Sequence, residues 1–180
     1  MKLNNIKYFF ILIFLLANIS LFAQQNLKNK INQLNEKGQK EGLWIDSTKN
    51  RINEIYYKNG IKSGVYKSYN KTRKLLVFGE YDDGLQSGIW YYFEEDGHLW
   101  FCLNDFSKNT YSTINEGDGT KYTPDYNCHM ISYYLNGNIK EEGLLLWSEG
   151  ESPESDFSIE YGEWKYYDEN GNLTEKKTFK

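Results

Sequence analysis

The chain has 180 residues and a formal charge of −4, and 17% of its residues are aromatic. A net negative charge argues against nucleic-acid binding, because phosphate contacts require clustered Lys and Arg. It also argues against attraction to anionic lipid headgroups. The nearest approach to a basic patch, Lys71 with Arg73 and Lys74, is predicted to be a solvated strand end.

Residues 1–23 have the layout of a secretory signal peptide. Lys2 and Lys7 precede an apolar run from Tyr8 to Phe22, and polar residues follow Ala23. The run is shorter than the roughly 20 apolar residues of a membrane-spanning helix, so a retained anchor is only the alternative. Cleavage after Ala23 would leave 180 − 23 = 157 residues and, by removing two lysines, a charge of −4 − 2 = −6. The mature chain is therefore expected to be periplasmic, cell-surface or secreted.

Residues 24–37 are predicted to be a lead-in to one domain that spans residues 38–180. Leu27, Ile31 and Leu34 are spaced as in a short helix before Gly38, and an extended or disordered lead-in is the alternative. Beyond the apolar N-terminal run, no other stretch keeps a helical period for three turns.

One phrase recurs along the domain. It reads GIWYYFEEDG at 88–97 and GEWKYYDENG at 162–171, and earlier copies open at Gly42 and Gly64. A degenerate fourth copy, HMISYYLNGNI, starts at His129. The shared frame is G-x-aromatic-x-x-aromatic-x-x-x-G-x-Leu, and recurrence at such intervals is typical of repeat proteins.

Each copy is predicted to be a β-hairpin. The segments IWYYFEE and EWKYYDE are short and aromatic, and they end in DG or NG pairs, which supply the positive φ of a tight turn. The apolar stretches at 74–81 and 139–147 would form the returning strands. The fold class is therefore expected to be all-β.

The phrases NEKGQKEGLW, YYKNGIKSGVYKSY, YDDGLQSGIWYYFEEDG and YGEWKYYDENGNLTE resemble the bacterial variant of the MORN repeat, as in proteins labelled YwqK-type antitoxins. The resemblance covers roughly residues 34–100 and 128–179. It implies a stack of about five antiparallel hairpins in one elongated, twisted single sheet. It also implies a function of the scaffold or partner-binding kind.

An insertion at 103–127 separates copies three and four. It is rich in Ser, Thr, Asn, Asp and Gly, so we expect a loop. Cys102 and Cys128 stand at its two ends, and in an exported chain such a pair favours a disulfide. The alternatives are two free thiols, or a metal site made with His98 and His129.

A second insertion, at 150–161, reads GESPESDFSIEY and is predicted to be a solvated acidic loop. A calcium-holding loop is the alternative, because carboxylate oxygens suit hard cations. The spacing matches no defined calcium motif.

A search for catalytic motifs argues against an enzyme. The sequence contains no G-x-S-x-G elbow, H-E-x-x-H, P-loop or dinucleotide fingerprint. Carboxylate pairs such as Glu94 with Glu95 sit beside predicted turns, where charge keeps a loop solvated. No catalytic residue, cofactor or metal is expected.

Aromatic residues recur in two rows. Because strand residues alternate between faces, the two rows fall on opposite sides of the sheet. The first is expected to stack as a spine shared by neighbouring repeats. The second is the candidate partner-binding strip, because tyrosine is common at interfaces. The spine residues are Trp44, Tyr66, Trp90, Met130 and Trp164, and the strip residues are Tyr69, Phe93, Tyr133 and Tyr167.

The sequence thus predicts an exported, non-enzymatic repeat module that binds an unidentified protein. Family resemblance suggests an immunity or antitoxin-like role, although export argues against a cytosolic antitoxin. The alternative is binding of a carbohydrate or another cell-envelope component by stacking on aromatic rings. Membrane recognition is a third hypothesis, which the charge opposes, and no nucleic-acid partner is expected.

Overall fold

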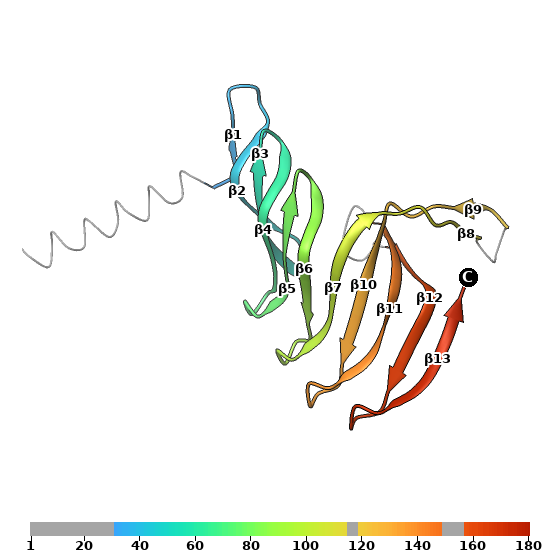
Figure 1. Ribbon diagram of the computed structural model, residues 1–180. Helices are drawn as coiled ribbons and strands as arrows, with labels where there is room; N and C mark the ends of the chain where they lie inside the picture. The colour runs from blue at the N-terminus through green and yellow to red at the C-terminus, as the bar shows by residue number, and fades with distance from the viewer. Residues whose placement is uncertain (1–30, 115–118, 149–156) are drawn as a thin grey trace, which may run out of the picture.

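The computed structural model describes residues 31–114, 119–148 and 157–180 (Figure 1). The predicted signal peptide, residues 115–118 of the first insertion and residues 150–156 of the second insertion lie outside the described residues, and so does most of the alternative calcium-holding loop. Within the described ranges every regular element is a β-strand, and no helix is long and apolar enough to cross a membrane. The all-β prediction is confirmed.

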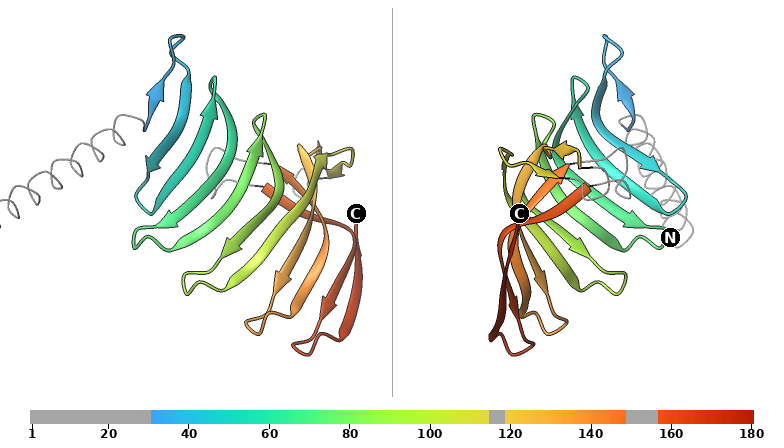
Figure 2. Two further views of the ribbon diagram at one scale, coloured as in Figure 1. Left: turned by 60° about the vertical axis from the view of Figure 1, so that its left-hand side comes forward. Right: turned by 90° about the vertical axis from the view of Figure 1, so that its right-hand side faces the viewer.

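Eleven strands form one antiparallel sheet in the order β1-β2-β3-β4-β5-β6-β7-β10-β11-β12-β13, and β8 and β9 form a separate pair. Figure 2 shows the long, twisted shape that results, in which successive hairpins lie side by side. The strands are β1 (Gln33–Leu34), β2 (Lys40–Ser47), β3 (Arg51–Lys58), β4 (Ile61–Asn70), β5 (Leu75–Asp82), β6 (Leu85–Phe93), β7 (Leu99–Lys108), β8 (Thr113–Ile114), β9 (Lys121–Tyr122), β10 (Tyr126–Tyr133), β11 (Ile139–Ser148), β12 (Phe157–Tyr167) and β13 (Leu173–Phe179).

The first glycine of the repeat frame marks a β-bulge two residues before each spine position. Gly64, Gly88 and Gly162 have φ values of 81°, 65° and 70°, which side chains with a Cβ rarely adopt. The fourth copy has Cys128 in this slot. There the irregularity lies in β7, where Asp105 has a φ of 54° and the pairing with β10 shifts.

The hydrophobic core lies on one face of the sheet, which we call the spine face. A single row of residues crosses it, and each member lies opposite or against the next on the neighbouring strand. Within it Trp90 and Trp164 are 2% and 1% exposed, although no second layer covers the row in the described structure. In strand order the row is Trp44, Ile55, Tyr66, Gly79, Trp90, Leu103, Met130, Gly143 and Trp164.

The buried tryptophans are shielded because each indole lies flat on a glycine of the preceding strand. An ideal Cβ on Gly79 would lie 2.3 Å from Trp90 Cδ2, and one on Gly143 would lie 2.4 Å from Trp164 Cδ2. Trp90 Nε1 donates a 3.1 Å hydrogen bond to the Glu80 carbonyl. Ring contacts with Tyr66 and Tyr81, at 5.3 and 5.0 Å between centroids, close the sides of the Trp90 indole.

The first insertion is not the loop that its composition predicts. Residues 103–108 continue β7, and β8 with β9 forms a short arm. The arm is held by Tyr111 against Tyr161 and by Tyr122 against Phe157, with ring centroids 4.8 and 5.0 Å apart. Tyr122 also donates to Ser148 Oγ at 3.0 Å. The arm therefore covers the far end of β11 and β12.

Two other predicted segments differ from the structure. Residues 157–161 of the second insertion belong to β12, and its residues 150–156 lie outside the described residues. Leu34 lies in β1, so the predicted helix through Leu27, Ile31 and Leu34 does not form over residues 31–34. Leu27 lies outside the described residues.

The predicted disulfide is absent, because Cys102 and Cys128 are both buried free thiols. Cys102 pairs with Ile131, whereas Cys128 lies an odd number of positions away on β10. Since alternate strand residues point to opposite faces, the two sulfur atoms lie on opposite sides of the sheet. The alternative metal site is not formed either: no group of three His, Cys, Asp or Glu side chains in the described residues could hold an ion.

Protein purified without reductant and then denatured is expected to titrate two free thiols per chain with a chromogenic disulfide reagent. The native protein should react slowly, because both side chains are buried and burial raises the pKa of Cys128 to about 12. Denatured protein with no titratable thiol would contradict the structure.

Candidate functional site

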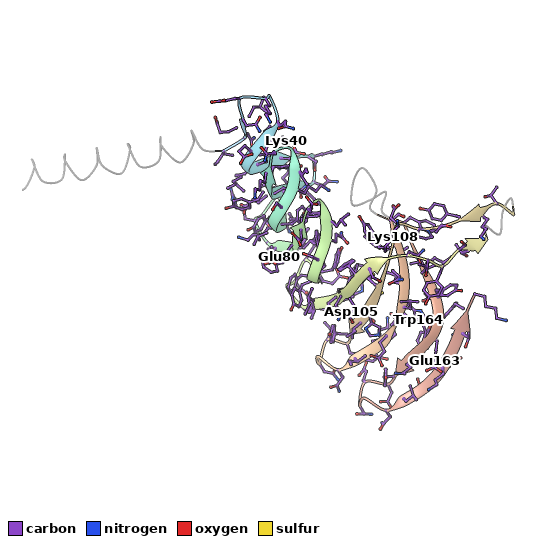
Figure 3. The ribbon with its side chains drawn as sticks, turned by 45° about the horizontal axis from the view of Figure 1, so that its top comes forward. Lys40, Glu80, Asp105, Lys108, Glu163 and Trp164 are labelled. Atoms are coloured by element: carbon purple, nitrogen blue, oxygen red, sulfur yellow. The ribbon has the colours of Figure 1, made fainter. Side chains whose placement is uncertain are left out.

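The second predicted row lies on the face opposite the spine, which we call the strip face. All four side chains are half-buried, and each lies at or next to the end of the first strand of its hairpin, where the pairing register shifts. The four residues are Tyr69, Phe93, Tyr133 and Tyr167. Figure 3 shows side chains standing on both faces of the sheet, with Glu163 and Trp164 labelled on β12. The exposure of the spine residues varies more: Tyr66, Trp90 and Trp164 are buried, whereas Trp44 and Met130 are half-buried.

A continuous cross-strand ladder runs beside the strip on the same face. Directly opposed residues of neighbouring antiparallel strands share a face, so the pairings define the ladder. Its central members are apolar, and a Glu beside a Lys flanks them on each side. In strand order it contains Ile45, Glu54, Lys67, Phe78, Tyr91, Cys102, Ile131, Glu142, Lys165 and Lys176.

Each strip aromatic contacts a neighbouring ladder residue. The contacted residue is a glutamate for the two outer tyrosines and an uncharged residue in the centre. Tyr69 Oη donates to Glu54 at 3.5 Å, and Tyr167 Oη donates to Glu142 at 2.7 Å. In the centre, the Phe93 ring stacks on Tyr91 at 6.4 Å between centroids. The strip and the ladder together therefore form one surface whose apolar centre is flanked on both sides by Glu-Lys pairs.

The fourth strip residue, Tyr133, completes the apolar centre. Its Oη lies 3.5 Å from Cys102 Sγ, and either atom could donate. Burial raises the pKa of Tyr133 to about 12, and the hydrogen bond with Cys102 acts in the same direction. The phenol is therefore neutral at physiological pH.

A hollow of about 500 Å³ adjoins the N-terminal end of the ladder. Its lining combines apolar and charged side chains of β3, β4 and β5, including Glu54, Val65, Lys67 and Phe78. Its shape gives a partner side chain a place to enter beside the apolar centre.

The C-terminal end of the ladder is organised by hydrogen bonds to one carboxylate. Glu142 accepts from Tyr167 and, at 3.2 Å, from Lys165 Nζ. The Tyr167 hydrogen bond is the largest cause of a lowered pKa at Glu142, and the Lys165 ammonium acts in the same direction. The same hydrogen bond raises the pKa of Tyr167.

Tyr167→Phe is expected to raise the pKa of Glu142 toward the ordinary value for glutamate, because it removes the strongest donor to the carboxylate. A lowered carboxyl pKa stabilises the fold above the unfolded-state pKa and loses that contribution as pH falls through the folded-state pKa. The variant should therefore lose less stability than wild type on acidification. An NMR titration of the Glu142 carboxyl carbon checks the shift, and an unchanged pKa would contradict the assignment.

Sequence reasoning named the strip but missed the ladder beside it. Phe78, Cys102 and Glu142 lie on returning strands, and only the cross-strand register places them next to Tyr91, Ile131 and Lys165. The sequence contains one clue to the ladder, because residues two positions apart on a strand share a face. The residues two positions before the strip aromatics are Lys67, Tyr91, Ile131 and Lys165.

A family model described as MORN repeat variant matches residues 129–145 and 160–180. These two stretches are similar to MORN repeats. The matched stretches cover the hairpin of β10 with β11 and that of β12 with β13. MORN repeats commonly act as protein or membrane interaction modules. Among curated proteins, none matches the chain.

Proposed function

We propose that this protein is an exported, non-enzymatic MORN-repeat module whose strip face binds a protein partner. The observation that carries the proposal is the composition of that face, where mostly half-buried apolar side chains lie between two Glu-Lys pairs. An apolar centre with a polar rim is the usual anatomy of a protein interface. The spine face offers less, because its central aromatics are sealed against the sheet.

A protein partner is favoured over a carbohydrate by the way the strip tyrosines are used. The hydroxyl groups of Tyr133 and Tyr167 are bonded to Cys102 and Glu142 of the same chain. Their rings are thereby fixed among neighbouring side chains of the sheet. Sugar recognition requires polar groups free to bond hydroxyls, whereas a protein interface is served by fixed, amphipathic aromatic area.

A single substitution of an apolar by a charged residue, at the centre of the strip face, tests the proposal. Ile131→Lys places a charge between Cys102 and Glu142 on the strip face, and is expected to reduce capture of the partner from a native envelope extract by at least about tenfold. Leu135→Lys is the matched control, because Leu135 is 78% exposed in the following turn. Circular dichroism checks that both variants fold. Equal capture by wild type and Ile131→Lys would overturn the proposal.

Export is a separate part of the proposal and rests on residues 1–23. Lys2 and Lys7, the apolar run and Ala23 support cleavage that leaves Gln24 as the first residue. N-terminal sequencing of the native protein checks this, and intact Met1 in the soluble cytosol would contradict it. The finer proposal of an immunity or antitoxin-like factor of bacteria rests on the family resemblance. It requires that the captured partner be a toxin.

A further inference from the structure

The two edges of the sheet are finished differently. At the N-terminal edge, Asn32 acts as a short substitute for a strand. Its backbone N–H donates to the Leu43 carbonyl at 2.9 Å, its Nδ2 donates to the Ile45 carbonyl at 3.0 Å, and its Oδ1 accepts from the Ile45 N–H at 2.6 Å. Together with β1, which pairs with Lys40 and Glu41, Asn32 occupies this edge.

The C-terminal edge is a full strand with a single neighbour. In the described structure β13 pairs only with β12, and all of its residues except Phe179 are exposed. An edge strand presents a row of backbone donors and acceptors, which is a template for pairing with another strand. At the other end of the sheet the edge strand is β1, which offers only two residues for pairing, so β13 is the longer free edge of the described structure.

The sequence of β13, LTEKKTF, is complementary to itself when it pairs antiparallel about Lys176. In that register Glu175 lies opposite Lys177 of the second copy, and Lys177 lies opposite its Glu175. The register shift of β12 with β13 leaves Thr174 without a direct partner on β12, so the self-complementary stretch is residues 175–177. Oppositely charged residues that face each other across a strand pair stabilise a sheet.

The faces of β13 agree with this register. Glu175, Lys177 and Phe179 pair with Tyr166, Trp164 and Gly162, so they stand on the spine face. The charge pairs would therefore continue that face into the second copy, whereas Leu173 lies opposite Tyr167, beyond the register shift, and stands on the strip face.

Lys176 stands on the strip face and would meet its own copy at the symmetry axis. Each Lys176 Nζ already lies 3.1 Å from Glu163 Oε1 of its own chain, which offsets the repulsion between the two ammonium groups. The only like-charged pair in the register is thus neutralised locally.

We propose that β13 pairs antiparallel with β13 of a second copy about a two-fold axis at Lys176, giving a closed dimer with one continuous sheet. A two-fold contact is self-complementary and uses up the same edge on both copies, so assembly stops at two chains. This proposal concerns the sheet edge and does not depend on what binds the strip face.

Lys176→Cys tests the axis directly in the full folded chain. Opposed residues of an antiparallel pair have Cα atoms about 4.5 to 5.5 Å apart, which suits a disulfide. Thr174→Cys is the matched control, because four residues separate it from its own copy along the strand, or about 14 Å. Under copper-phenanthroline oxidation Lys176→Cys is expected to form a covalent dimer at least about tenfold faster than Thr174→Cys or wild type. Equal rates would overturn the proposal.

A charge swap gives an independent test of the register. Glu175→Lys or Lys177→Glu alone places like charges opposite each other, and the symmetry applies each change twice. We therefore expect either variant to weaken dimerisation by about tenfold in sedimentation velocity, and the double variant E175K/K177E to restore it. A double variant no better than the single ones, or a wild-type chain that stays monomeric at all concentrations, would overturn the proposal.

Discussion

Gly79→Ala is expected to lower the free energy of unfolding by about 3 kcal/mol or more, a large effect for one methyl group. The new Cβ would lie 2.3 Å from Trp90 Cδ2 and 2.5 Å from Cε2. The indole cannot move aside freely, because Tyr66 and Tyr81 close its sides and its Nε1 is bonded to the Glu80 carbonyl. Urea unfolding followed by tryptophan fluorescence measures the change.

The control for Gly79→Ala comes from the fourth copy, where Met130 stands opposite Leu103 on the preceding strand. A flexible methionine is compatible with a side chain beneath it, whereas a flat indole is not. The double variant Gly79→Ala, Trp90→Met is therefore expected to be more stable than the sum of the two single losses predicts. Strictly additive losses would contradict the packing described for Trp90.

Trp90→Ala is expected to cost about 3 to 5 kcal/mol, as removal of a large buried aromatic usually does. Its indole is 2% exposed and links β5, β6 and β7, so the loss should loosen neighbouring repeats as well. Tyr133→Ala and Tyr167→Ala on the strip face should each cost less than about 2 kcal/mol, because these side chains are only half-buried. Denaturant unfolding of the three variants decides the matter. Equal, large losses in all three would mean that both faces are core.

The hairpin architecture was predictable because the frame encodes its own geometry. A bulge glycine, an aromatic two residues later and an Asn-Gly or Asp-Gly turn are local signals that act within one hairpin. In the second copy Arg73 stands where the other copies have the turn glycine. It still adopts a positive φ, 64°, as Gly97, Gly137 and Gly171 do in the corresponding turns. The pairing of successive hairpins then follows from chain order.

The insertions were harder to predict because tertiary packing overrides their polar composition. Residues 103–108 read as a loop, yet Phe106 packs against the spine-face core and keeps β7 extended. The arm is stabilised by contacts of Tyr111 and Tyr122 with residues 157–161, which lie more than thirty positions away in sequence. Composition alone carries no information about such distant partners.

The cysteines show why a candidate site needs the register. Spacing places Cys102 and Cys128 at the two ends of one insertion, which favours a bridge. Cys102 pairs with Ile131, which lies three positions from Cys128 on β10, so the two cysteines stand on opposite faces instead. The same limitation hid Gly79 and Gly143, whose role depends on which residue lies across from each tryptophan.

The central claim is that the strip face binds a partner whereas the spine face forms the packed core. Site-specific photo-crosslinking in the native envelope tests it most directly. A benzophenone side chain is placed at Phe93 on the strip face or at Phe101 on the spine face, two half-buried phenylalanines on paired strands. The Phe101 ring stacks on Tyr92 at 4.3 Å, so it represents the packed face. We predict that the probe at Phe93 joins the chain to a partner protein and that the probe at Phe101 does not. Partner crosslinks from Phe101 but not from Phe93 would contradict the assignment of the strip face as the binding surface.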